Sequence, residues 1–231
     1  MDELSAQALL AELQSVDDER ARRAADPSLD ARVQAVKHYQ QRRFERSYAD
    51  LFASERYAGA ARFFLDELYG PADFRQRDAQ FARVIPTLTR LFPAEVVATV
   101  AQLARLHALS ERLDTRMAQQ LDEAPLDAAR YAAAWRACGE PEARALQIAL
   151  TLEVGQALDR LTAKPLLRQS LRLMRAPAKA AGLGALQHFL ESGFDTFRAM
   201  RGAGEFLALV NEREQQLAAS LFRGEGLGQL P

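Results

Sequence analysis

The sequence has few of the residues on which disulfide-bonded and thiolate metal proteins depend. Cys138 is the only cysteine among 231 residues, and there are three histidines and one tryptophan. A single cysteine excludes an internal disulfide and a metal cage built from thiolates. We therefore expect a protein of the reducing cytoplasm.

Long apolar runs and an excess of either charge are also missing. No stretch approaches the roughly 18 uncharged apolar residues of a membrane span. The first residues, Met1-Asp2-Glu3-Leu4, are acidic, whereas a secretory signal starts with positive charge, so we expect no signal peptide. The formal net charge is −1, and no groove-reading motif is evident, so we expect no nucleic-acid binding, although a local basic patch remains compatible with this total.

Helical periodicity runs through most of the chain. Hydrophobic residues make up 48% of the sequence and charged residues 26%, which is typical of a folded globular protein. We find no internal repeat and no linker long enough to separate domains. The predicted fold is therefore all-α: a single-domain, multi-helix, mainly antiparallel bundle over residues 1–223, with a flexible tail at 224–231. Apolar spacing predicts helices over residues 3–25, 29–54, 55–69, 74–91, 94–121, 126–137 and 141–163, and one or two helices after 182.

One aromatic segment near residue 65 stands out, because it joins buried-type residues to two acids and then to a helix stop. It reads Phe63-Phe64-Leu65-Asp66-Glu67-Leu68-Tyr69-Gly70-Pro71. Phe64 and Leu68 are four residues apart and form one apolar stripe with Phe63. Gly70 suits the position after a helix end, and Pro71 cannot continue the helix. We interpret the segment as a structural corner between two helices.

The helix after this corner carries two local signals. Asp73 and Gln76 have the spacing of a capping box, which predicts a helix start at Phe74. Pro86 lies inside the same helical pattern, where it removes one backbone hydrogen bond. We therefore predict a kink or a short break around Pro86.

The corner resembles a known signature. The segment 63–70, followed by Pro71-Ala72-Asp73-Phe74 and Arg77-Asp78, is similar to the motif of the FFLEELY motif family, which comprises uncharacterised proteobacterial helical proteins. Asp66 replaces a glutamate of that motif and keeps its charge. The resemblance is specific over residues 63–93. It implies a bacterial helical protein of similar length, and it implies no reaction.

Acidic residues gather around the corner, and a second polar group lies on a later helix. Paired carboxylates can hold a hard cation or exchange protons when burial shifts their pKa values. Alternatively, Arg77 and Asp78 bridge to Glu67 and serve the helix ends only. His107, Glu111 and Asp114 are four and three residues apart, which puts them on one face of a helix.

These two groups define one candidate site, although a simpler interpretation is open. The candidate is a metal or small-molecule site of a helical enzyme or ligand carrier, formed by Glu67, Asp78, His107 and Glu111. The simpler interpretation is a solvated or salt-bridged His107. The paired Glu and His motifs of di-iron bundles are missing, so we assign no metal, no cofactor and no catalytic residue.

A basic stripe is the other candidate. It consists of Arg160, Lys164, Arg168, Arg172, Arg175 and Lys179, spaced by three or four residues, and no acid occurs between 160 and 190. We predict a basic amphipathic helix bounded by Pro165 and Pro177. Such a helix could bind phosphate groups, an acidic partner helix or an anionic membrane face, or it could be a solvated face that packs near acids of another helix.

Two functions follow from these candidates. The first is a non-catalytic interaction or scaffold protein that uses Arg168, Arg172 and Arg175 to contact a protein partner or an anionic ligand, with a homodimer as one possible assembly. The second is the helical enzyme or ligand carrier with the buried carboxylate and histidine site. The two differ in whether the acids near the corner and His107 converge on one pocket.

Overall fold

The computed structural model describes residues 2–69 and 74–231. In this part of the chain all regular structure is helical, so the predicted all-α, multi-helix fold is confirmed. The α-helices of the first half are α1 (Asp2–Ala24), α2 (Pro27–Ser47), α3 (Ala49–Ala53), α4 (Ala58–Phe63), α5 (Arg75–Leu91) and α6 (Ala94–Ala118), with a π-helix, η1 (Phe64–Tyr69), after α4. Those of the second half are α7 (Ala128–Cys138), α8 (Pro141–Thr162), α9 (Pro165–Ala180), α10 (Gly184–Ala199) and α11 (Gly204–Arg223), followed by a short 3₁₀ turn, η2 (Leu227–Gln229).

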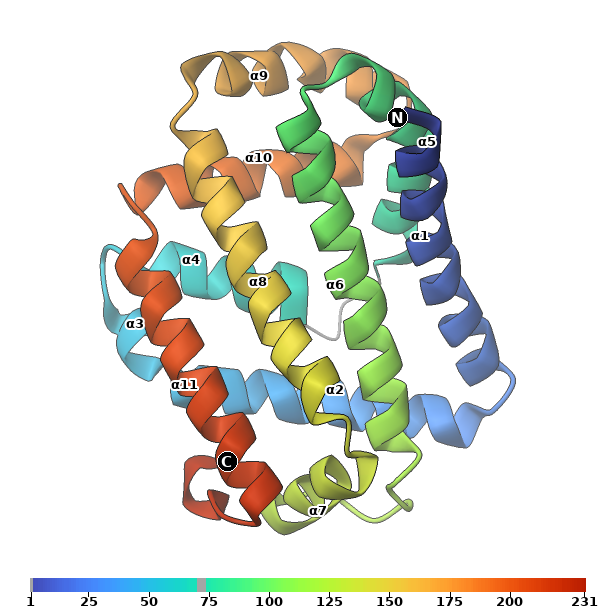
Figure 1. Cartoon of the computed structure of the whole chain (residues 1–231), viewed down its shortest axis with the longest axis vertical. Helices are drawn as coiled ribbons and strands as arrows, with labels where there is room; N and C mark the ends of the chain where they lie inside the picture. Colours follow the sequence, from blue (N-terminus) through green and yellow to red (C-terminus); the bar gives the residue numbers. More distant parts are fainter. Residues whose placement is uncertain (1, 70–73) are drawn as a thin grey trace.

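The helices form two crossed layers (Figure 1). In the first layer α6 packs against α1 and α8, and α8 packs against α11. The helices α2, α4 and α10 cross behind this layer, while α9 covers one end of the molecule and α7 the other (Figure 1). Within the first layer α8 is antiparallel to α6 and α11, whereas α1 runs in the same direction as α6 (Figure 1). None of the described helices is long and apolar enough to cross a membrane.

The predicted continuous helix over residues 29–54 is wrong, because the chain breaks at Tyr48. There α2 ends and α3 begins, and the Tyr48 backbone leaves the helical region, with φ −121° and ψ 23°. Its side chain is fully buried, and its hydroxyl donates a 2.7 Å hydrogen bond to Glu214. This burial and hydrogen bond offset the loss of helix continuity.

The aromatic segment also differs from the prediction. The helix expected from residue 55 begins at Ala58, and the chain from Phe64 onward adopts the wider π-helical turn. Phe63, Phe64 and Leu65 are consecutive and all buried, at 7%, 2% and 6% exposure. Consecutive residues of an α-helix point about 100° apart, so a regular surface helix buries three in a row only with difficulty.

Aromatic neighbours on α10 and α11 account for this burial. The Phe63 ring stacks on Phe189 at a centroid distance of 5.7 Å, and the Phe64 ring meets Phe206 edge-on at 5.3 Å. Gly193 of α10 lies directly against Phe63, where a Cβ atom would come within 2.9 Å of the ring. The expected corner residues Gly70, Pro71 and Asp73 lie outside the described residues.

The next helix, α5, starts at Arg75 and continues through Pro86, so the structure shows no break there. Pro86 lies on the exposed side, and its neighbour Ile85 is fully buried. The helix packs mainly against α1 and α10, and this packing stabilises it despite the proline.

The segment 224–231 differs from the expected flexible tail because it packs back onto the body. Gly224 and Gly226 have positive φ angles of 79° and 84°, which turn the chain after α11. Leu230 is only 2% exposed, and the Tyr39 hydroxyl donates a 3.2 Å hydrogen bond to the backbone oxygen of Pro231.

Candidate functional site

A pocket of about 100 Å³, partly open to the surface, lies beside α6, and we call it the central cavity. Its wall also includes residues of α1, α2, η1, α5, α8 and α10. Glu67, Asp78, His107 and Glu111, the four residues of the predicted buried site, all line it. The structure thus brings together residues from three separate segments of the chain.

One face of α6 forms the long side of this cavity. Val100, Ala104, His107, Glu111 and Asp114 all line it and recur at intervals of four and three residues. The first two are apolar and the last three are polar. The central cavity therefore changes from apolar to polar along α6.

The other helices continue this division. The apolar side chains of the lining are Leu13, Phe74, Phe81, Val100, Leu103, Ala104, Leu106, Leu186, Phe189 and Leu190. The polar side chains are Lys37, Gln40, Glu67, Arg77, Asp78, His107, Ser110, Glu111, Asp114, Gln147 and Thr151. The lining thus combines apolar and polar side chains in nearly equal numbers.

Asp78 is the centre of one ionic group. Its Oδ2 lies 2.9 Å from Nε2 of His107 and accepts a 2.9 Å hydrogen bond from Nη2 of Arg20. Burial alone would raise the pKa of Asp78, but the His107 hydrogen bond and the charges of His107, Arg77 and Arg20 outweigh it and hold the pKa below its usual value. Asp78 is therefore ionised at neutral pH, and His107 lies within hydrogen-bond distance of its carboxylate.

Glu111 is the centre of a second ionic group. Nζ of Lys37 donates a 2.8 Å hydrogen bond to Oε1, Nη2 of Arg23 bonds to Oε2, and Nη2 of Arg20 lies 3.6 Å from Oε1. Burial works against ionisation, but the charges of Lys37 and Arg23 outweigh it and lower the pKa of Glu111 to about 2. The Glu111 carboxylate is therefore fully engaged by the protein.

Asp114 differs from both of these acids. It is 6% exposed and accepts a 3.0 Å hydrogen bond from Nε2 of Gln40. Among the described residues, none with a positive charge forms an ion pair with it. Burial, together with the nearby Glu111 charge, raises the pKa of Asp114 despite the opposing effects of the Lys37 and Arg144 charges and of the Gln40 hydrogen bond. The polar end of the cavity thus contains one carboxyl group without a cationic partner.

The π-helix positions Glu67 at the cavity wall. Nη1 of Arg77 donates a 3.0 Å hydrogen bond to the Glu67 backbone oxygen and lies 3.5 Å from its Oε2, so the predicted bridge between these residues is confirmed. The Arg77 guanidinium also covers the rings of Phe74 and Phe189, at 4.0 and 4.7 Å from their centroids. Single π-helical turns occur often at functional sites, and here the turn belongs to the wall of the cavity.

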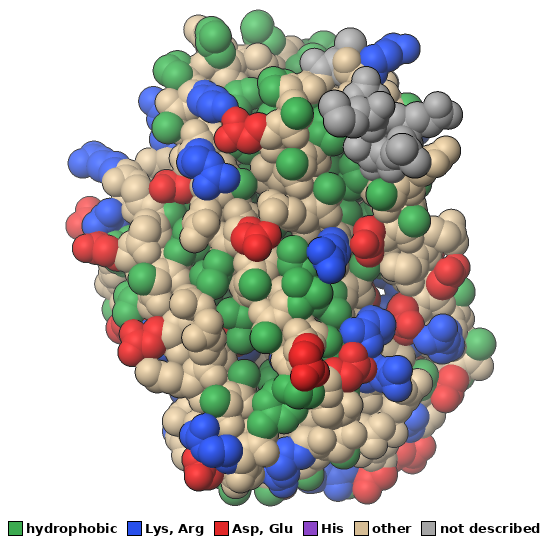
Figure 2. All heavy atoms as spheres, viewed as in Figure 1, with side chains coloured by type: hydrophobic (Ala, Val, Ile, Leu, Met, Phe, Trp, Pro, Cys, Tyr) green, Lys and Arg blue, Asp and Glu red, His purple; other side chains and the backbone are tan. Residues whose placement is uncertain are grey.

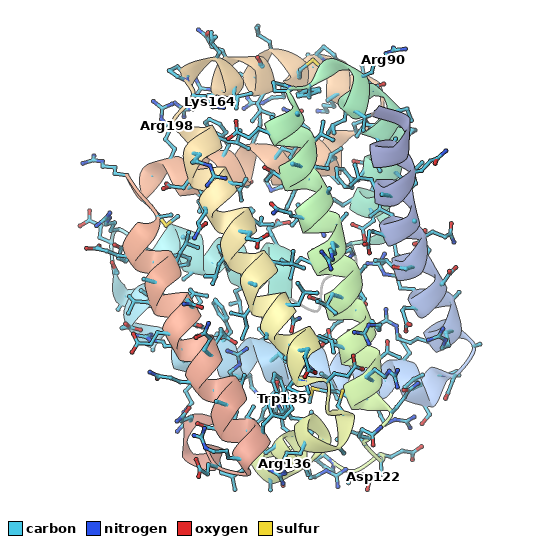
Figure 3. The ribbon with its side chains drawn as sticks, viewed as in Figure 1. Arg90, Asp122, Trp135, Arg136, Lys164 and Arg198 are labelled. Atoms are coloured by element: carbon cyan, nitrogen blue, oxygen red, sulfur yellow. The ribbon has the colours of Figure 1, made fainter. Side chains whose placement is uncertain are left out.

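The basic stripe is not one helix face, because Arg160 belongs to α8 while most of the other members belong to α9. Pro165 begins α9, and Lys164 precedes it as the N-cap residue. Figure 3 shows Lys164 at the α9 end of the molecule.

Most cations of the stripe have acidic partners from distant segments. Arg160 and Lys164 pair with Glu95, at 3.8 Å for Arg160. Arg168 pairs with Asp195 at 2.9 Å, and Arg175 with Glu191 at 2.9 Å. In the described structure Arg172 and Lys179 form no ion pair, and both are exposed.

No curated protein matches the chain, and neither does any solved structure. The profile of a family described as a domain of unknown function (DUF8198) matches residues 19–226. The chain belongs to this DUF8198 family. The matched range contains nearly all of the central cavity lining, including the π-helix and the polar face of α6. Membership in the FFLEELY motif family stays a prediction.

Sequence reasoning found the acids of the cavity and missed several of their partners. Arg20, Arg23 and Lys37 lie on helices whose other positions are also rich in charge, so no pattern distinguished them. The spacing places Asp114 on the same helix face as His107. Spacing within one helix does not predict that Asp114 forms no ion pair with a positively charged side chain. In the part of the chain that the structure describes, no cluster of three or more His, Cys, Asp or Glu side chains is placed to hold a metal ion.

Proposed function

We propose that the protein binds a small organic molecule with an amine or hydroxyl group in the central cavity. The observation that carries this proposal is the position of Asp114, a buried carboxyl group without an ion pair at the polar end of the central cavity. A buried carboxyl group gains most from a ligand that donates hydrogen bonds or brings positive charge.

The size of the cavity limits the ligand. An engineered cavity of about 150 Å³ takes up one benzene molecule. The central cavity, at about 100 Å³, fits a molecule of roughly four to six non-hydrogen atoms. A branched four-carbon group with one polar atom has this size.

The charges of the wall favour an amine over a carboxylate. Lys37 is engaged by Glu111, and Arg77 by Glu67 and Asp78. A carboxylate ligand would have to compete for these cations and would face the same acids. An amine would instead donate hydrogen bonds to the Asp114 carboxyl group and bring it a positive charge.

Thermal unfolding with two probes of similar shape tests the proposal: isobutylamine and isobutyrate. We expect isobutylamine to raise the Tm of the wild type and of Asp66→Asn, a control for an exposed acid of the aromatic segment. Isobutylamine should not raise the Tm of Asp114→Asn. Isobutyrate should leave the Tm of all three proteins unchanged. An equal response of Asp114→Asn, or a response to isobutyrate, would contradict the proposal.

We propose an interaction through α9 as a second function, because this helix combines apolar exposure with unpaired charge. Leu166, Leu173 and Met174 are 75%, 78% and 50% exposed, and they are spaced as residues i, i+7 and i+8 on one face. Arg172 and Lys179 are exposed on another side of the same helix, about 100° and 120° around the axis from Leu173. Hydrophobic side chains are visible at the α9 end of the molecule in Figure 2.

The partner that fits this face is a protein with an apolar groove and an acidic rim. Anchors spaced at i, i+7 and i+8 are typical of a helix that docks in a groove. A lipid surface fits less well, because each cation near an anionic membrane contributes only about 1 kcal/mol and α9 offers two that are unpaired.

Affinity capture with matched variants tests this second function. Leu173→Asp should no longer capture a partner protein that the wild type and the control Leu10→Asp both capture. Arg172→Glu should bind the same partner more weakly than the wild type does. Retention of the same partner by Leu173→Asp would contradict the role of α9. Binding to vesicles of anionic lipid that Leu173→Asp abolishes would identify a membrane and would contradict the groove.

A further inference from the structure

A second, smaller cavity of about 30 Å³ lies between α2, α7, α8 and α11. Its lining consists of Gln40, Arg43, Tyr131, Trp135, Arg144, Gln147, Ile148, Glu214, Leu217 and Ala218. Gln40 and Gln147 also line the central cavity, so their side chains form the wall between the two spaces. Figure 3 shows Trp135 at the end of the molecule opposite α9.

Three hydrogen-bond donors of this lining have no acceptor within the described residues. They are Nε of Arg43, Nε1 of Trp135 and Nη2 of Arg144, and all three atoms are buried. The arginines themselves are 5% and 4% exposed. A buried donor without an acceptor is costly, so three around one small cavity indicate a bound acceptor.

Arg144 is the most unusual of these residues. Its Nη1 donates a 3.1 Å hydrogen bond to Oε1 of Gln147, and its guanidinium covers the Trp135 ring at 4.1 Å from the centroid. Neither partner carries a negative charge. In the described structure no carboxylate pairs with Arg144, although buried guanidinium groups are normally paired.

The charges of the lining leave one positive charge unbalanced. Arg43 pairs with Glu214, which also accepts the hydrogen bond from Tyr48. Arg144 is the remaining charged side chain of the lining. One negative charge inside the cavity would therefore neutralise its wall.

We infer that the smaller cavity binds one small monovalent anion of the size of chloride. The volume of about 30 Å³ admits a monatomic ion and excludes a larger organic anion. A chloride ion accepts several N–H bonds at once and balances Arg144. A water molecule carries no charge and would leave Arg144 without an ion-paired counter-charge, since the Asp114 carboxyl group acts on it only electrostatically. This site is distinct from the proposed amine site, since it uses donors where the other uses a carboxyl group.

Thermal unfolding in increasing chloride, with gluconate added to hold the ionic strength constant, tests the inference. At a chloride concentration ten times the Kd, we expect the Tm of the wild type to rise by roughly 3–5 °C. Arg144→Met should abolish this rise, and the exposed neighbour control Arg136→Met should keep it. In chloride-free buffer Arg144→Met should be at least as stable as the wild type, because it removes an uncompensated buried charge.

A second variant covers the case in which Arg144→Met does not fold. Trp135→Phe keeps the ring beside Arg144 and removes only one N–H donor, so it should weaken the chloride dependence without abolishing it. Crystals grown in bromide should show an anomalous peak within hydrogen-bond distance of Nη2 of Arg144. Two results would overturn the inference: a wild-type Tm that is independent of chloride, or electron density at this position without an anomalous signal from bromide. Either would show that the cavity holds only water.

Discussion

Oδ2 of Asp78 lies 2.9 Å from Nε2 of His107, across 29 residues of sequence. The same oxygen accepts a 2.9 Å hydrogen bond from Nη2 of Arg20, so one carboxylate joins α5 to α6 and to α1 at the wall of the central cavity. Arg20, Arg77 and His107 thus all contact one buried carboxylate, that of Asp78.

Asp78→Asn should destabilise the protein strongly, because it leaves Arg20 and Arg77 close together without their shared acid. We expect a loss of about 3 kcal/mol in the free energy of unfolding, measured by urea denaturation at pH 7. The control is Asp195→Asn, which breaks the exposed pair with Arg168 and should cost at most about 1 kcal/mol. Equal losses in the two variants would contradict the account of the Asp78 group.

Glu111 should make the protein sensitive to acid. Its pKa is about 2 in the folded state and 4.5 ordinarily, so its contribution is fully present above pH 4.5 and is lost as the pH falls towards 2. This contribution amounts to about 3 kcal/mol. Glu111→Gln should lower the free energy of unfolding at pH 7 and flatten its decline between pH 4.5 and 2. An unchanged slope would mean that Lys37 and Arg23 do not stabilise the carboxylate.

Asp114 should behave in the opposite way, because its folded-state pKa is raised. The folded protein then binds the proton more tightly than the unfolded chain does, so the contribution of Asp114 to stability falls as the pH rises above the ordinary value of 3.8. Asp114→Asn retains an oxygen that accepts the Gln40 hydrogen bond. We expect this variant to be as stable as the wild type or more stable at pH 7, in the same urea measurement. A loss comparable to that of Glu111→Gln would contradict the unpaired state of Asp114.

The contact between α10 and the π-helical segment should not tolerate a methyl group. Gly193→Ala places a Cβ atom 2.9 Å from the Phe63 ring, which is fixed in the core, so we expect a loss of about 1–3 kcal/mol in the free energy of unfolding. Gly184→Ala is the matched control on the same helix, because its Cβ atom would meet nothing within 4 Å. The control should be neutral or slightly stabilising. Similar losses in both would mean that helix α10 is sensitive to alanine for another reason.

Local periodicity accounts for what the sequence could predict. The helices follow from apolar spacing, and the common face of His107, Glu111 and Asp114 follows from their intervals of four and three. The break at Tyr48 could not be predicted, since it depends on Glu214, which lies 166 residues away. The π-helix likewise depends on rings from α10 and α11 that pack around Phe63 and Phe64.

The ion pairs show the same limit. The segment 160–190 contains no acid, yet Arg168 and Arg175 are paired, because α10 brings Asp195 and Glu191 beside them. Conversely, the partners of Glu111 come from α1 and α2, more than 70 residues away. Sequence spacing identifies residues on one helix face, whereas charge neutralisation depends on which helices become neighbours.

The crystal structure of the wild-type protein soaked in isobutylamine tests the central claim most directly. The proposal predicts one amine molecule in the central cavity, with its nitrogen within hydrogen-bond distance of the Asp114 carboxyl group. A central cavity that contains only water at an isobutylamine concentration that raises the Tm would contradict it, as would an amine whose nitrogen binds elsewhere.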